Sequence, residues 1–303
     1  MRLRVVQLAA AAVLLAAGIV VGAGPLQHDG DQRARDLTAV RKDLAAARRH
    51  NVELTRTSDL GSAFAAATLA RTVAGSLTGR SVALVVLPGA DPDQVTRLSA
   101  AVATAGGKVT ARVEVRPAAV APTGRGLTEA LTTQMVAQTP GLVVAPGASG
   151  YGRFGALLAR AVGVPPAAKL LQAPYDPTAV SVLAGFETAK LIGTPQVSAR
   201  AALTLVVTGR RATDFAVTTL SDAVAAYGVQ IPTVVVGPAA AARKGGLLER
   251  LRSGASRSTV STVDGTETAT GWATAVLALS AKTRGVTGAY GGVGAVSAAV
   301  PPL

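Results

Sequence analysis

The sequence predicts a doubly wound α/β domain with a mainly parallel sheet, preceded by an N-terminal transmembrane helix and a short coiled coil. Three observations support this fold class. A charge-free apolar run lies near the N-terminus, and a stretch with apolar side chains at alternating steps of three and four follows it. Strand-length apolar runs then alternate with helical segments over residues 80–285. Such alternation is typical of parallel sheets covered by helices on both faces.

The apolar run covers residues 5–24, and Arg2 and Arg4 stand just before it. About 20 apolar residues cross the ~30 Å hydrocarbon core of a bilayer, so residues 1–26 are predicted to form a transmembrane anchor. A cleaved signal peptide is the alternative, because residues 21–23 are small, although the run exceeds the usual apolar region of about 7–15 residues. In both cases the arginines hold the N-terminus in the cytoplasm. We therefore expect a single-pass membrane protein with an extracytoplasmic C-terminal domain.

Residues 27–60 are predicted to form a coiled-coil stalk that pairs two copies of the chain in parallel. The a and d positions of its heptads carry an apolar stripe interrupted by one amide, which typically fixes register and dimer state. The stripe consists of Leu37, Val40, Leu44, Asn51 and Leu54. The G-x-x-x-G pair Gly18 and Gly22 favours the same dimer. The alternative is an amphipathic helix that packs on its own domain. Gly61 is expected to end the helix, and a second helix is expected over residues 62–76.

The α/β domain is assigned to residues 61–285. Its first unit is a continuous apolar strand at 81–87, a helix from Pro92 to 105 that Asp91 caps, and a strand at 108–115. The same strand–helix–glycine–strand order recurs over residues 203–231. Further elements are expected as strands at 142–145, 233–236 and 259–263, and as helices through 247–251 and over 267–282. Residues 286–303 are rich in glycine and proline and are predicted to be an irregular tail.

Composition excludes several classes of enzyme. The chain has no cysteine and two histidines, His28 and His50, which both precede the α/β domain. A Ser-His-Asp triad, a Cys-His pair or a histidine-rich zinc site therefore cannot form within that domain. We predict no catalytic residue, no metal ligand and no cofactor.

The formal net charge of +13 is typical of proteins that meet polyanions, but the exported location disfavours nucleic acid as a partner. An aromatic share of 3% also leaves few stacking platforms for single strands. The competing interpretation of the charge is an arginine-rich solvated surface without a dedicated partner.

Gly150, Gly152 and Gly155 form a literal G-x-G-x-x-G motif ahead of a helical run, and Asp176 lies near the position of a ribose-binding acid. They are therefore candidate cofactor-binding residues. Residues 146–149 separate the motif from its expected strand by more than the tight first turn allows, and Asp176 lies in a turn sequence. A glycine-rich loop ahead of a helix is the alternative interpretation.

Asp264 follows the strand at 259–263, and Glu267 begins the next helix. Ligands of open α/β sheets bind at such carboxyl ends, so Asp264 is a further candidate. Helix capping and the helix dipole explain the same residues without a ligand. Arg210 and Arg211, which follow another strand, can contact an anion or simply be surface charges.

The order of these blocks resembles the actinobacterial copper-transport protein family. The blocks are the anchor ending in the glycine pair, the short coiled coil, the domain opening SVALVVLPGAD at 81–91, and STVDGTETATGWATAVLAL at 261–279. The resemblance covers nearly the whole chain. It implies a role in copper efflux or homeostasis at the cell envelope, and it allows an outer-membrane location.

The residues themselves do not indicate copper transport. Copper prefers Cys, Met and His, and the chain has no cysteine, two methionines and two histidines. Copper is thus a partner only through the family resemblance. The leading hypothesis is an envelope-anchored, extracytoplasmic binding or scaffold module that is not an enzyme. The alternative is a receptor-like, ligand-binding α/β domain unrelated to copper.

Overall fold

The computed structural model describes residues 30–210 and 212–302. The chain divides into two compact units, Met1–Asp59 and Leu60–Leu303. The anchor predicted over residues 1–26 lies outside the described residues. Among the helices that are described, none is both long and apolar enough to cross a membrane.

One helix, α2, runs without a break over Gly30–Val73. The predicted interruption at Gly61 and the separate helix at 62–76 are therefore wrong. A glycine costs only about 1 kcal/mol inside a helix, and a Cβ at this position would meet no atom within 4 Å. Long helical flanks outweigh that penalty. The last turns of α2 belong to the second unit and pack into its core through Leu69 and Val73.

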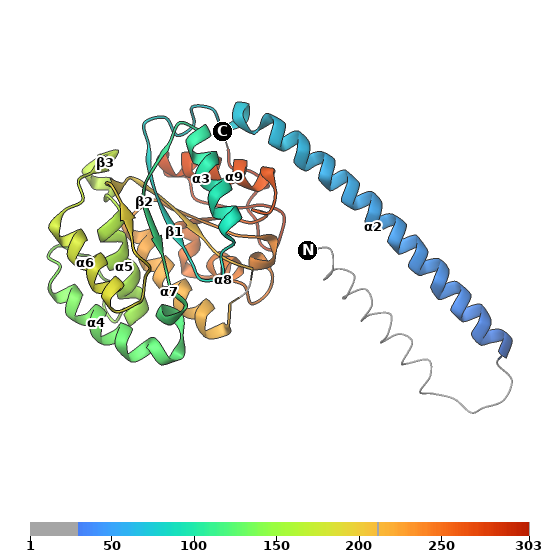
Figure 1. Ribbon diagram of the computed structural model, residues 1–303, viewed down its shortest axis with the longest axis horizontal. Coiled ribbons are helices and arrows are strands. Elements are labelled where there is room, and N and C mark those ends of the chain that lie inside the picture. Colours follow the sequence, from blue (N-terminus) through green and yellow to red (C-terminus); the bar gives the residue numbers. More distant parts are fainter. Residues whose placement is uncertain (1–29, 211, 303) are drawn as a thin grey trace. The chain divides into compact units, whose positions relative to one another are not determined.

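The second unit is an α/β domain built on a seven-stranded sheet in the order β4-β2-β1-β6-β7-β8-β9. Figure 1 shows this sheet surrounded by helices. All neighbouring pairs are parallel except β4 with β2. The strands of this sheet are β1 (Ser81–Val86), β2 (Lys108–Glu114), β4 (Gln196–Val197), β6 (Leu203–Val207), β7 (Thr233–Val236), β8 (Val260–Val263) and β9 (Ala289–Tyr290). A separate pair joins β3 (Gln172–Ala173) to β5 (Arg200–Ala201). The predicted fold class, α/β with a mainly parallel sheet, is confirmed.

Helices cover both faces of the sheet. The helices of the α/β domain are α3 (Pro92–Thr104), α4 (Arg125–Ala137), α5 (Gly150–Val162), α6 (Pro177–Thr188), α7 (Asp214–Gln230), α8 (Leu247–Ser253) and α9 (Ala269–Thr283). The face with α3 and α9 buries Val82, Leu84 and Leu205, and the face with α5, α7 and α8 buries Ala83, Val85 and Val206. Apolar residues at successive strand positions thus fill two cores, as expected for a sheet buried on both sides.

Two local predictions differ from the structure. Residues 142–145 are not a strand, and Val143 is 68% exposed. The tail at 286–303 is not wholly irregular, because β9 extends the sheet beside β8. The order of the main strands, β2-β1-β6-β7-β8, is the 2-1-3-4-5 arrangement of doubly wound folds, in which ligands bind at the carboxyl ends near the strand-order switch. In this domain the switch lies between β1 and β6.

Candidate functional site

At the switch point, the loops that follow β1 and β6 lie against each other at two glycines. A Cβ built on Gly209, after β6, would lie 2.1 Å from the carbonyl oxygen of Gly89, after β1. Gly89 has φ +80°, a conformation that favours glycine. The two loops therefore touch through their backbones. Arg210 is exposed beside this contact, and residue 211 lies outside the described residues.

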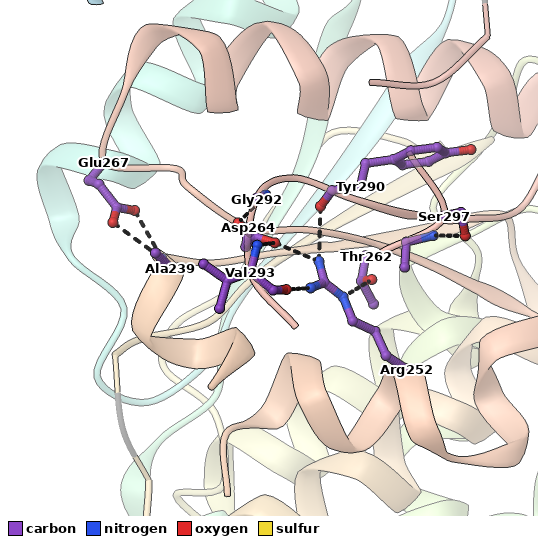
Figure 2. A network of polar contacts seen from close by, with 10 residues as sticks. Ala239, Arg252, Thr262, Asp264, Glu267, Tyr290, Gly292, Val293 and Ser297 are labelled. Atoms are coloured by element: carbon purple, nitrogen blue, oxygen red, sulfur yellow. Dashed lines mark hydrogen bonds and ion pairs between the residues drawn. The ribbon is translucent and has the colours of Figure 1, made fainter. Parts of the chain in front are cut away.

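Asp264 lies directly after β8, and its side chain is buried in a polar network (Figure 2). Its carboxylate accepts hydrogen bonds from Arg252 Nη2 at 2.9 Å and from the backbone N–H groups of Gly292 at 3.0 Å and Val293 at 3.4 Å. The side chains of Asp264 and Arg252 are each 2% exposed. The ion pair thus joins α8 to the end of β8, and the two backbone N–H groups attach the C-terminal tail to the same carboxylate.

Arg252 completes the network from the last turn of α8. Its guanidinium donates to Thr262 Oγ1 at 2.9 Å, to the Tyr290 carbonyl at 2.9 Å and to the Val293 carbonyl. A planar guanidinium carries five N–H donors, so it can bind a carboxylate and several carbonyls at once. With its charge neutralised and its oxygens already bonded, Asp264 serves as an internal clamp. The sequence prediction placed it correctly at a carboxyl strand end, but its role is the attachment of the tail.

Sequence reasoning missed Arg252. It lies four residues after Leu248, on the face of α8 that is buried. Residues four apart lie on the same helix face, so this spacing places Arg252 beside a core leucine, and a cation that is buried there requires an anion nearby. That signal could have paired Arg252 with Asp264.

Glu267 precedes the first residue of α9, which begins two positions later than predicted and is capped by Thr268. Its carboxylate accepts from the backbone N–H of Ala239 at 3.1 and 3.2 Å (Figure 2). Ala239 opens the short 3₁₀ helix η4 (Ala239–Ala242) after β7. Glu267 therefore holds two loops of the carboxyl edge together.

The three motif glycines lie inside α5 and not in a loop. Ser149 caps the helix by accepting from the N–H of Gly152 at 3.1 Å, and Gly150 is the first helical residue. A Cβ on Gly155 would lie 1.9 Å from the Ala223 carbonyl of α7, and one on Gly150 would lie 2.3 Å from Glu129 Oε2 of α4. Gly150 and Gly155 thus let α4 and α7 approach α5 closely, whereas a Cβ on Gly152 would meet only ordinary contacts at 3.6 Å or more. Helix packing therefore accounts for two of the three glycines, and the expected glycine-rich loop is wrong because all three lie within α5.

Asp176 is the N-cap of α6, where its carboxylate accepts from the N–H of Ala179 at 2.8 Å. It also pairs with Arg160 at 3.0 Å and Arg200 at 3.2 Å. Desolvation raises the pKa of this carboxyl, but the backbone N–H and the two arginines outweigh it, so the pKa falls below its ordinary value. Asp176 is thus fully engaged in local structure.

Within the described residues, no group of three or more His, Cys, Asp or Glu side chains could hold a metal ion.

A family model described as copper transport outer membrane protein, MctB, matches residues 1–301. The chain belongs to this family. The resemblance inferred from the ordered sequence blocks is confirmed. No protein of curated function matches the chain.

Membership supports a function related to copper transport and an association with a membrane. The match covers both the predicted anchor at residues 1–26 and the α/β domain.

Proposed function

We propose that the chain acts in copper homeostasis at the cell envelope as a membrane-anchored module, whose α/β domain binds or organises partners outside the cytoplasm and catalyses no reaction. The observation that carries this proposal is the family match over residues 1–301. The predicted span at 5–24, with arginines on its cytoplasmic side, supports the topology.

The use of the polar residues supports a binding or scaffold role. Asp264 is neutralised by Arg252, Glu267 caps η4, and Asp176 caps α6. Ligands of this fold bind outside the carboxyl ends of the strands, where Asp264 and Glu267 are already bonded to other parts of the protein. In this proposal copper is the ion transported by the system in which the chain works. The α/β domain acts in that system as a scaffold that binds other components.

We propose further that two copies pair in parallel through α2. Leu37, Val40 and Leu54 are 57%, 50% and 53% exposed in the single chain. The continuous helix keeps the heptad register beyond Asn51 without a break. Two membrane anchors would hold the copies close together and compensate for the weakness of a short seam.

A deletion strain tests the copper role. Loss of the gene should increase sensitivity to copper salts, and the full chain supplied in trans should restore growth. Sensitivity to zinc serves as the control and should stay unchanged. If the deletion strain grows on copper as well as the parent, the proposed function is wrong.

The topology has its own test. A reporter fused after Leu303 should be active outside the cytoplasm, and the mature chain should keep its N-terminus. A mature chain that begins at Gly24 would show a cleaved signal peptide and would remove the anchor from the proposal.

A further inference from the structure

A cleft of about 560 Å³ lies at the amino edge of the sheet, opposite the strand ends that usually bind ligands. It is bounded by the first residues of β6, by the ends of α7 and α9, and by the loop 164–171. Its size falls within the ~300–1,000 Å³ range of small-molecule sites. The residues that decide its chemistry are Arg80, Lys169, Leu170, Leu171, Val229 and Lys282.

The charges of this cleft are all positive. Arg80, Lys169 and Lys282 line it, and no acidic residue is among the lining side chains. The C-terminal end of a helix favours cations, which accounts for Lys282 in the last turn of α9. Arg80 and Lys169 lie on loops and not in the last turn of an α-helix. The dipole of an α-helix therefore does not account for their positions. Three cations converge on one concavity without a lining carboxylate to neutralise them.

Lys282 is held in place by the protein. Its ammonium donates to the Thr259 carbonyl at 2.7 Å and to Thr287 Oγ1 at 2.9 Å, so the described contacts use two of its three N–H donors. Burial lowers the pKa of this ammonium. A bound anion would favour its charged form again.

The other walls of the cleft carry apolar side chains that are exposed to solvent. Leu170 is 53% exposed, Leu171 47% and Val229 63%. The loop that carries the two leucines is fixed, because the Ser81 hydroxyl donates to the Leu171 carbonyl and accepts from the N–H of Ala202. Exposed apolar side chains on a fixed concave surface indicate a binding site.

We propose that this cleft binds an amphiphilic anion, a hydrocarbon chain with a carboxylate or phosphate head. The head group contacts Lys169, Lys282 and Arg80, and the hydrocarbon lies along Leu170, Leu171 and Val229. This combination satisfies both the cations and the apolar walls. The proposal does not depend on the copper role, since it rests on residues of the α/β domain alone.

The test measures binding to the full-length chain in lipid nanodiscs by calorimetry, with empty nanodiscs subtracted. The probes are octanoate, octyl phosphate, octylammonium and octanol, which share one hydrocarbon chain and differ in the head group. At least one of the two anionic probes should bind, and octylammonium and octanol should bind at least tenfold more weakly. Preference for octanoate indicates a fatty-acid-like ligand, and preference for octyl phosphate indicates a lipid head group. Equal binding of octylammonium or octanol would overturn the proposal.

Two lysines of the chain provide a matched pair of variants. Lys169 and Lys190 are both exposed and have positive φ of 53° and 58°, a backbone that asparagine tolerates. Lys169→Asn should weaken binding of the anionic probe about two- to fivefold, as expected for one partly exposed charge, and Lys190→Asn should leave it unchanged. Val229→Asp, which puts a like charge on the exposed wall, should weaken it at least tenfold. Equal affinities of the two asparagine variants would contradict the site.

Discussion

Replacing Asp264 by asparagine should lower the unfolding free energy of the α/β domain by about 3–5 kcal/mol. The carboxylate is 2% exposed and neutralises Arg252, which is equally buried. Asparagine keeps the size of the side chain but leaves a guanidinium without a counter-charge in the interior. Breaking a buried pair by removing one partner has a cost of about this size, because the remaining charge stays desolvated.

The loss is large relative to the ~5–15 kcal/mol that usually separates folded from unfolded chains. For a domain of this length, each kcal/mol shifts the melting temperature by about 2–4 °C, so we expect a decrease of roughly 6–20 °C. The single tryptophan, Trp272, reports unfolding by fluorescence. It lies in α9, and its indole donates to the Thr266 carbonyl at 2.8 Å. The tail beyond β9 should also become sensitive to protease, since two of its N–H groups bind Asp264.

Glu114→Gln is the matched control, because Glu114 pairs with Arg112 at 2.6 Å while both side chains remain 39–55% exposed. This variant should lose less than about 1 kcal/mol. The double variant Arg252→Met with Asp264→Leu removes both buried charges and should be more stable than Asp264→Asn. If Asp264→Asn melts within 2 °C of the parent, the ion pair does not hold the tail.

Three further predictions concern the helices. Gly155→Ala should cost about 1–3 kcal/mol, because its Cβ would overlap the Ala223 carbonyl, whereas Gly61→Ala should stabilise α2 by about 0.5–1 kcal/mol; denaturant titration measures both. The lowered pKa of Asp176 stabilises the fold above about pH 4, and this contribution disappears as pH falls through the folded-state pKa, so the stabilities of Asp176→Asn and the parent should converge in acid. Leu44→Asp should reduce crosslinking between copies in membranes without changing the melting temperature of the α/β domain; undiminished crosslinking would contradict the proposed seam.

The main strands were predictable because they are buried on both faces. The strand at 233–236 was predicted with the bounds of β7, and the predicted strand at 81–87 exceeds β1 by one residue. A continuous run of branched apolar residues bounded by turn residues has few alternatives in an alternating α/β pattern. The run at 142–145 has the same composition, yet it pairs with no strand of the sheet. The sequence of a short apolar run does not show whether it pairs with an edge of the sheet. In this structure β4, and not the run at 142–145, pairs with β2 at the edge of the sheet.

The site residues were less predictable, because their partners are distant in sequence. The G-x-G-x-x-G spacing alone does not reveal that Ala223 of α7 and Glu129 of α4 lie against the glycines. Asp264 was placed correctly at a strand end, but its partner Arg252 and the tail residues Gly292 and Val293 are joined to it only by the fold. Local sequence specifies an element and its end, and it does not specify which distant charge is buried beside it.

The positions of the charges explain why the amino edge, and not the carboxyl edge, is open to a ligand. At the carboxyl edge, Gly291 with φ +126° lies so close to Asp264 that a Cβ would be 2.3 Å from Oδ2, so the tail covers the carboxylate. A ligand there would have to displace a clamp whose rupture leaves a buried charge unpaired. At the amino edge, Lys169 and Arg80 line an open cleft, and an anion that enters it gains their attraction without breaking an internal ion pair. The end of β8 at the usual binding edge is thus part of the internal structure, and we expect the cations that line the cleft to favour binding of an anion at the opposite edge.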